Sequence, residues 1–441
     1  MGIVELSHII IGTAICLFLI VFGSSSIRER KSRAAFLSLI MLIAFGSIWF
    51  GGYILFKPSP FFLSIPNIIT LFMALLFFMP FGKRSSIKVG DITERVDERD
   101  IMFARNEYEP GTEKYDKYYA DHPELKKIDD RIRKLPEFLS HGGRYYDQAR
   151  SAEVQSIFKS VRSFLNHVDG EIDATRQQLD KMAITKEMKE MVLEHEAADV
   201  GVARLNPAYV YSRVGRGPEP WGAPINNNHT YAIVFTLEMD YFKVEQAPRL
   251  PITEESAAQY LNAAKLSIPL AEYIRNLGYP ARAHISGSNY QIMLPAVAYD
   301  AGLGELGRLN YLISPKLGAR VRLGAVTTDL PLIPDKPINF GVQNFCARCK
   351  KCATNCPSGS IASGGKTDIR GVEKWTFDIE KCFRYWKAIG TDCGLCMKVC
   401  PYSHPPTFTH NTVRAGIKSS SFAQIVSAWA DDLFYGKKVK F

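Results

Sequence analysis

Charged side chains are missing from three stretches near the N-terminus. Residues 6–27, 34–56 and 58–82 contain no Asp, Glu, Lys or Arg. Each stretch is about as long as the roughly 20-residue helix that crosses a ~30 Å hydrocarbon layer. A soluble protein would need three consecutive helices that are apolar on all sides, so we expect three membrane-spanning helices. A cleaved signal peptide is disfavoured, because the acidic Glu5 stands where basic residues normally precede the apolar run.

A long block of charge of one sign is also missing. The net charge is +9, but the basic residues between positions 83 and 134 are interspersed with acidic ones. This pattern indicates a solvated surface, and we expect no nucleic-acid partner. A composition of 46% hydrophobic and 22% charged residues excludes general disorder, and 441 residues allow two or three domains.

The distribution of basic residues around the apolar stretches predicts their orientation. Residues 28–33 carry four basic side chains, the next loop carries only Lys57, and residues 83–88 carry three more. Basic flanking residues tend to stay in the cytoplasm. We therefore expect a multi-pass protein of the cytoplasmic membrane, with its N-terminus outside and everything after residue 82 facing the cytoplasm.

Cysteine is absent between Cys16 and Cys346, and the last eight of the nine cysteines lie between residues 346 and 400. The first run reads Cys-x2-Cys-x2-Cys-x3-Cys-Pro, in which three thiolates bind one iron–sulfur cluster and the fourth binds its neighbour. One predicted [4Fe-4S] cluster is held by Cys346, Cys349, Cys352 and Cys400. The other is held by Cys356, Cys382, Cys393 and Cys396.

Two other roles for these cysteines remain open. Paired Cys-x2-Cys motifs also suit zinc, and disulfides would form in an oxidising compartment. The repeated pattern of three close thiols and a distant fourth favours clusters, and a reducing cytoplasm suits thiolate ligands. Cys16 lies in an apolar run and is expected to serve packing.

The soluble part alternates between helical and extended patterns. We expect helices within residues 145–196, a buried strand at 230–239, a helix at 256–277 and further strands at 281–286 and 320–329. This alternation predicts an α/β fold of two or three layers. The expected divisions are a membrane anchor (1–83), a wrapping segment (84–195), an α/β domain (196–340), a cysteine domain (341–406) and a tail with one helix at most (407–441).

A glycine-rich segment, AGLGELGR, occupies residues 301–308. Its glycines would let a ligand approach the backbone closely, although a helix end followed by a turn explains them equally well. A strict Rossmann fingerprint is excluded, because the segment follows a helical pattern instead of a strand.

The order of AGLGELGR, GARVRLGAVTTDLPL and the two cysteine runs resembles the cobalamin-dependent reductive dehalogenases and the related epoxyqueuosine reductases. Glu305, Arg308 and Asn289 depart from the epoxyqueuosine branch and favour the dehalogenases. The resemblance implies a nitroreductase-like core that binds base-off cobalamin and a bacterial-ferredoxin-like domain with two [4Fe-4S] clusters. It also implies a set of cofactor-binding residues, Gly302, Gly304, Glu305, Gly307, Arg308, Thr328 and Asp329.

Reductive removal of halide from an organohalide needs two electrons and one proton. By resemblance the proton donor is a tyrosine, best matched by Tyr260 and next by Tyr241. Because a free tyrosine has a pKa near ~10, a cation must stabilise its phenolate, and Arg322 is the candidate. Asn289 would donate a further hydrogen bond.

Respiratory members of this family usually have a twin-arginine leader and a separate anchor protein, whereas this chain is expected to anchor itself. Its electron donor would be quinol, ferredoxin or flavodoxin. Two alternatives remain: a cobalamin reductase of another substrate, similar to epoxyqueuosine reductase, and a membrane electron-transfer subunit without catalysis. The sequence identifies neither the organohalide nor the oligomeric state.

Overall fold

Three apolar helices begin the first of the two compact units into which the chain divides. The structure, a computed structural model, describes residues 2–80, 82, 84–90, 92, 94–287 and 289–439. The first unit comprises Met1–Ser86, Phe340–Lys351 and His404–Lys440. Its apolar helices are α1 (Ile3–Arg28), α2 (Ser32–Gly46), which continues through a π-helical turn (Ser47–Gly51) into α3 (Gly52–Phe56), and α4 (Pro60–Phe78).

These helices are long enough to cross a membrane. The spans Ile3–Arg28, Ser32–Phe56 and Pro60–Phe78 contain 26, 25 and 19 residues, and about 20 residues at a rise of 1.5 Å each cover the hydrocarbon layer. Many of their large apolar side chains are exposed, as in helices whose outer faces contact lipid. The prediction of three helices of membrane-spanning length is confirmed.

Polar groups inside this helical bundle pair with one another. The ring of His8 hydrogen-bonds through Nδ1 to Oδ1 of Asn67 at 2.9 Å, and it stacks on Trp49 with ring centroids 4.4 Å apart. The Trp49 indole N–H in turn donates to the backbone oxygen of His8. Such pairs join apolar helices where water is excluded.

The C-terminal segment forms two helices, so the prediction of at most one is wrong. They are α17 (Phe408–Ser419) and α18 (Ser421–Tyr435). Ser420 between them has an extended backbone, and its hydroxyl caps α18 by accepting from the N–H groups of Phe422 and Ala423. The break has no glycine or proline to mark it, because a serine N-cap ends one helix and starts the next. Both helices pack against the apolar helices, together with α13 (Val342–Cys349) against α18.

The second unit, Ile87–Asn339 with Cys352–Ser403, is built around a four-stranded sheet. Its strand order is β1-β2-β6-β3, and every neighbouring pair is antiparallel. The strands are β1 (Asp199–Arg204), β2 (Tyr231–Glu238), β6 (Val321–Thr328) and β3 (Ala281–His284).

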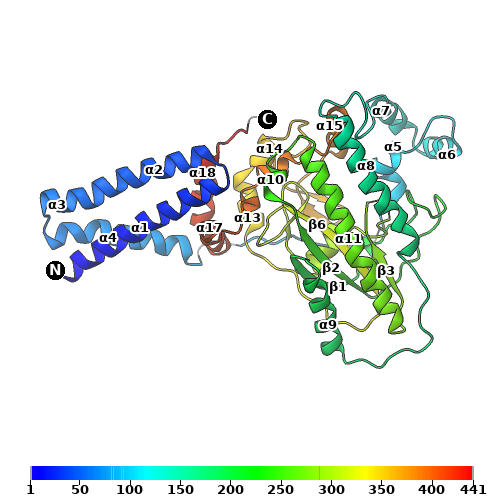
Figure 1. Cartoon of the computed structure of the whole chain (residues 1–441), viewed down its shortest axis with the longest axis horizontal. Coiled ribbons are helices and arrows are strands. Elements are labelled where there is room, and N and C mark those ends of the chain that lie inside the picture. The colour runs from blue at the N-terminus through cyan, green and yellow to red at the C-terminus, as the bar shows by residue number, and fades with distance from the viewer. Residues whose placement is uncertain are drawn as a thin grey trace. The chain divides into compact units, whose positions relative to one another are not determined.

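Helices cover both faces of this sheet, as Figure 1 shows for α11 (Pro251–Asn276). Alternate β2 residues point to opposite faces. Ile233 and Phe235 belong to the core beneath α11, whereas Ala232 and Val234 belong to the core with α12 (Leu294–Asp300). A strand buried on both faces has a continuous apolar sequence. The predicted buried strand and the mixed helix and sheet architecture are confirmed.

Short helices surround this layered core. Those of the wrapping segment are α5 (Met102–Asn106), α6 (Glu113–Asp121), α7 (Pro123–Arg133), α8 (Gln148–Ser163) and α9 (Lys181–Glu194), and a short α10 (Tyr241–Val244) precedes α11. The cysteine-rich part contains α14 (Lys351–Thr354), α15 (Ile379–Ile389), α16 (Leu395–Lys398) and the strands β7 (Thr367–Ile369) and β8 (Val372–Lys374). The strands β4 (Glu305–Leu306) and β5 (Leu312–Ile313) form a small pair.

A buried ion-pair network joins the wrapping segment to the cysteine-rich part. Arg105 on α5 donates to Asp129 on α7 at 2.6 and 2.9 Å and to Glu380 on α15 at 2.6 Å. A buried arginine requires such carboxylate partners, since an unpaired charge would be costly. The network fixes α5 beside α15, and both helices contribute to the wall of the site described next.

Candidate active site

A cavity of about 580 Å³ lies in the second unit. Its wall combines side chains from distant parts of the sequence: Phe103 and Glu137 of the wrapping segment, Phe158 of α8, Tyr260 of α11, Tyr290, Tyr311, Arg322 of β6, Trp386 of α15 and Asp392. Aromatic and aliphatic walls with a few converging polar groups are typical of small-molecule sites.

Two of the predicted catalytic residues meet in this cavity. The guanidinium carbon of Arg322 lies 5.2 Å from the centre of the Tyr260 ring. Tyr260 is half-buried on α11 and also approaches Phe158, with ring centroids 6.2 Å apart. A cation over an aromatic ring is attracted to its electron-rich face, and the same charge would stabilise a phenolate.

Asp392 and Ser256 hold Arg322 in this position. The guanidinium donates to the hydroxyl of Ser256 and, at 3.3 Å, to Oδ2 of Asp392. Burial alone would lower the pKa of Arg322, but the nearby Tyr260 and Asp392 outweigh it and raise that pKa. Burial raises the pKa of Asp392, although Arg322 opposes that shift. The cation therefore stays charged beside Tyr260.

Other ionisable groups line the same cavity. Burial raises the pKa of Tyr211 to about 12 and that of Tyr290 well above its ordinary value. The Lys387 ammonium donates to Asn106 at 3.0 Å and to Glu137 at 2.8 Å. Arg216 lies over the ring of Phe103, 5.5 Å from its centre. The cavity lining thus carries basic and acidic side chains in similar numbers: Arg162, Arg216, Arg322 and Lys387 with Glu107, Glu137 and Asp392.

Asn289, the third predicted catalytic residue, is absent from the cavity wall. Its side-chain oxygen accepts from the N–H groups of Ile285 and Ser286 at 2.9 and 3.1 Å, and its amide donates to the oxygen of Ala283. The side chain thus fixes the loop after β3, which leads to the cavity residues Ser286 and Gly287. Tyr241, the alternative proton donor, is buried beneath Arg320 and also lies off the cavity wall.

The residues predicted to bind the cofactor contact other parts of the protein. A Cβ on Gly302 would lie 2.6 Å from the oxygen of Lys336, and one on Gly304 would lie 2.2 Å from that of Ile313. Gly302 has a positive φ of 75° directly after α12, which is the helix end and turn that the sequence left open. These glycines therefore allow close approach of protein backbone.

The other predicted cofactor ligands have similar packing roles. Gly307 N–H donates to Tyr311, and Glu305 pairs with Ile313 in the β4–β5 ladder. Buried Arg308 donates to the oxygens of Ala362 and Gly364. Thr328 donates to Pro280, and Asp329 accepts from Thr230. All seven residues fall within the part of the chain that the structure describes, and none of them lines the cavity. Their contact with a cofactor stays a prediction.

Four cysteines line a second, smaller cavity. They are Cys356, Cys382, Cys393 and Cys396, the set that the sequence assigns to one cluster. None of the four forms a disulfide. Burial raises the pKa of Cys382 and of Cys393 to about 12, and neighbouring thiols add to the shift. Metal must replace these protons for the thiols to act as ligands.

The two cavities share part of their walls. Both are lined by Tyr311, Arg322, Trp386 and Asp392. Of the two cavities, Tyr260 lines only the larger and the four thiols line only the smaller, so these four shared side chains adjoin both.

The second predicted cysteine set is divided between the two units. Cys346 and Cys349 lie one turn apart on α13 in the first unit, and Cys352 and Cys400 lie in the second. Cys346, Cys352 and Cys400 are each less than a tenth exposed. The prediction that they bind one cluster stays a prediction.

Sequence reasoning missed Asp392, Ser256, Tyr311 and Lys387. Asp392 directly precedes Cys393 within the lengthened gap of the second cysteine run, and that unusual gap was the available signal. Nothing in the local pattern distinguishes Ser256 or Tyr311 from ordinary core residues. Both matter because they lie beside Arg322 of β6, which is distant from them in the sequence or on another element.

Comparison with known proteins agrees with this arrangement. Residues 345–404 match a family model described as a 4Fe-4S dicluster domain. The tetrachloroethene reductive dehalogenase of Sulfurospirillum multivorans is 32% identical over 274 residues, a match that covers 54% of this chain and 54% of that protein. The epoxyqueuosine reductase of Bacillus cereus is 33% identical over 121 residues, covering 26% of this chain and 30% of that protein.

A solved structure extends the comparison to the fold. The catabolic reductive dehalogenase NpRdhA superposes with a TM-score of 0.66 and 25% identity, covering 83% of this chain and 51% of that one. The fold and the thiol-lined cavity therefore define an iron–sulfur protein with the architecture of the reductive dehalogenases. The chain is related to that family, as its motifs predicted, and more distantly to the epoxyqueuosine reductases. It matches about half the length of the two reductive dehalogenases named above and 30% of the Bacillus cereus reductase.

Proposed function

We propose that this chain is a membrane-anchored reductive dehalogenase that removes halide from an organohalide with cobalamin and iron–sulfur clusters. The shared wall between the thiol-lined cavity and the larger cavity carries the proposal. It gives electrons a short path to a chamber in which Tyr260 lies against a cation. The named activity of the similar proteins agrees with this function.

The donor set fits the proposed clusters. Four thiols around one small cavity match the ligand requirement of a [4Fe-4S] cluster. We assign the second cluster to Cys346, Cys349, Cys352 and Cys400, which complete the pattern of the dicluster family. Two clusters would deliver electrons singly to a reaction that consumes two.

The aromatic side chains that line the larger cavity would suit the face of a flat organic ring. None of the described residues that line it is a histidine, and the buried His284 hydrogen-bonds to Thr327 instead, so we propose that cobalamin binds in its base-off form. When bound, it supplies a reducible cobalt centre for cleavage of the carbon–halogen bond. Tyr260, Trp386 and the loop at Ser286–Gly287 would contact the cofactor and the substrate.

The protein's own residues supply the proton and stabilise the charge that its transfer leaves. The overall reaction converts R–X, two electrons and one proton into R–H and halide. The Tyr260 hydroxyl holds the proton, and its transfer to the reacting carbon leaves a phenolate. Arg322 stabilises that anion, while Asp392 and Ser256 keep the guanidinium in place. Asn289 positions the loop instead of touching the substrate.

Three helices of membrane-spanning length would anchor the chain to a lipid bilayer. We propose that the catalytic part faces the cytoplasm, because residues 28–33 carry four basic side chains while the next loop carries only Lys57. Quinol in the membrane or a reduced cytoplasmic ferredoxin or flavodoxin would supply the electrons.

Halide release by the purified holoprotein tests the proposal. With a low-potential chemical reductant, the wild type should release halide from halogenated phenols or alkenes and contain both cobalt and about eight iron atoms per chain. Tyr260→Phe should abolish release while leaving iron and corrinoid content unchanged, and Tyr241→Phe is the matched control. Full iron with no cobalt, or a Tyr260→Phe enzyme with wild-type turnover, would refute it.

A further inference from the structure

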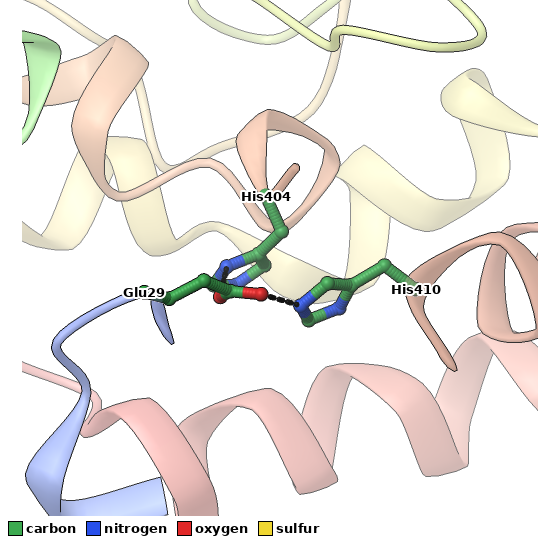
Figure 2. A group of neighbouring side chains, drawn as sticks. All are labelled: Glu29, His404 and His410. Carbon is green, nitrogen blue, oxygen red and sulfur yellow. Dashed lines mark hydrogen bonds and ion pairs between the residues drawn. The ribbon is translucent and has the colours of Figure 1, made fainter. Parts of the chain in front are cut away.

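A second group of ionisable side chains lies in the unit that contains the apolar helices. Glu29 directly follows α1, His404 lies just after the cysteine runs, and His410 lies on α17 (Figure 2). One ligand atom from each of these residues lies within 4.8 Å of the other two. Glu29 and His410 are each less than a tenth exposed. The thiol clusters and the proposed dehalogenation use none of the three.

Two polar atoms in this group face each other without a hydrogen bond. Oε2 of Glu29 and Nδ1 of His404 are 3.7 Å apart, which is too long for a hydrogen bond. Both atoms are buried, and neither finds a hydrogen-bond partner among the described residues. Leaving a buried carboxylate oxygen unsatisfied is costly. A metal ion about 2.0–2.2 Å from each atom would fill the gap, because tetrahedral ligands then stand about 3.4 Å apart.

Asp431 holds His404 in the orientation that a metal ligand needs. The Nε2 atom of His404 lies 3.2 Å from Oδ1 of Asp431 on α18. If Nε2–H donates to that carboxylate, Nδ1 is left with a free lone pair directed at Glu29. Metal-bound histidines usually donate their other nitrogen to a carboxylate in this way. Burial opposes ionisation of Asp431, but the His404 hydrogen bond and the pairing with Lys351 outweigh it and lower the pKa of that carboxyl.

The third residue completes the donor set. Nε2 of His410 lies 3.0 Å from Oε1 of Glu29, and its ring stacks on that of His404 with centroids 4.6 Å apart. Burial and the neighbouring His404 lower the pKa of His410 to about 4, so this imidazole is neutral at pH 7. In the proposed site, His404 keeps this orientation, and the His410 ring turns about χ2 to direct Nε2 at the shared ion.

The charges of the group also suit a cation. Burial opposes ionisation of Glu29, but favourable interactions with His404 and His410 outweigh it and lower the pKa of that carboxyl to about 2. Burial opposes the charge on His404 too, yet Asp431 and Glu29 raise its pKa. Without a metal, the proton on His404 supplies the positive charge between the Glu29 and Asp431 carboxylates. Metal binding would release that proton.

We propose that Glu29, His404 and His410 bind one divalent transition-metal ion, with Asp431 as the residue that orients His404. Two imidazoles and one carboxylate are a donor set that zinc and ferrous iron accept, with a position left for water. The ion would join the loop after α1 to α17, and so connect the first apolar helix to the segment that follows the cysteines. The site shares no residue with either proposed cluster.

Elemental analysis combined with X-ray absorption tests this site in the full-length, detergent-purified holoprotein. The wild type should contain about one zinc per chain, or about one iron beyond the roughly eight of the clusters. At the edge of that element, nitrogen and oxygen neighbours near 2.0–2.1 Å with imidazole scattering are expected. His410→Ala and Glu29→Gln should lose that one equivalent and keep the cluster iron. Exposed His195 on the other unit supplies the control, His195→Ala, which should retain the metal.

The role of Asp431 has its own measurement. Asp431→Asn should weaken metal retention against a chelator by about 10–100-fold without abolishing it, because it removes an orienting partner and leaves the three ligands. Absence of any stoichiometric metal beyond the clusters in the wild type would overturn the proposal even if a variant fails to fold. Equal metal content in Glu29→Gln, His410→Ala and wild type would also overturn it. A wild-type protein that contains this metal but releases no halide would count against the proposed dehalogenation and leave the metal site standing.

Discussion

Removing the charge of Arg322 should slow halide release without emptying the site of its cofactors. The guanidinium lies 5.2 Å from the centre of the Tyr260 ring, and two unit charges at that distance interact by about 3 kcal/mol at an effective dielectric constant of about 20. If this interaction is made mainly with the phenolate left after proton transfer, its loss should lower kcat roughly 150-fold. That value lies within the range found for removal of a single stabilising donor.

The single substitution Arg322→Gln would also leave Asp392 buried without its cation. Since that defect would affect stability as well as catalysis, Arg322→Gln combined with Asp392→Asn is the better variant. The assay is steady-state halide release under anaerobic conditions, with iron and corrinoid measured in the same sample. Arg176→Gln is a matched control. The Arg176 guanidinium also lies over a tyrosine ring, 4.4 Å from the centre of Tyr279, but neither residue lines the cavity.

The reasoning predicts a fall in kcat that exceeds any change in KM. Arg176→Gln should stay within a few-fold of wild type. A double variant with full cofactor content and a kcat within threefold of wild type would refute the role given to Arg322. A loss confined to KM would instead assign Arg322 to substrate binding.

Three further predictions follow from particular contacts. Cys393→Ser should leave about half of the cluster iron, since its thiol faces only the smaller cavity; full iron content would contradict the ligand assignment. Gly304→Ala should destabilise the protein by about 1–3 kcal/mol, because its Cβ would lie 2.2 Å from the oxygen of Ile313, and an unchanged melting temperature would exclude that clash. Burial, partly opposed by a hydrogen bond from Tyr209, raises the pKa of Asp300 to about 6. Between about pH 4 and 6 the unfolded chain therefore releases a proton that the native carboxyl still holds. The free energy of unfolding falls as the pH rises through this range. Asp300→Asn should therefore raise the melting temperature at pH 7.5 and have less effect at pH 5; an equal effect at both would be inconsistent with this.

The sequence alone determined the features that depend on local pattern. Three uncharged stretches are enough to predict helices that could cross a membrane, because their length and composition have no common alternative. The cysteine spacing assigned Cys356, Cys382, Cys393 and Cys396 to one set, and the structure places these four around one cavity. Only Cys393 and Cys396 are close in sequence, and the repeated motif, in which a fourth cysteine binds the neighbouring cluster, assigned Cys356 to them. The buried strand at β2 was also readable, since burial on both faces leaves a continuous apolar run.

Only the tertiary structure decided which residues share a site. Tyr260 and Arg322 were proposed as partners by resemblance, and their contact depends on α11 packing over β6. The glycine-rich segment looked like a ligand loop, yet its glycines accommodate neighbouring backbone at Lys336 and Ile313. The serine-capped break in the C-terminal segment was missed because its signal is a hydroxyl that becomes a cap only when folded. Glu29 and His410 lie 381 positions apart in the sequence, and no local pattern could have paired them, because packing of α17 against α1 brings them together.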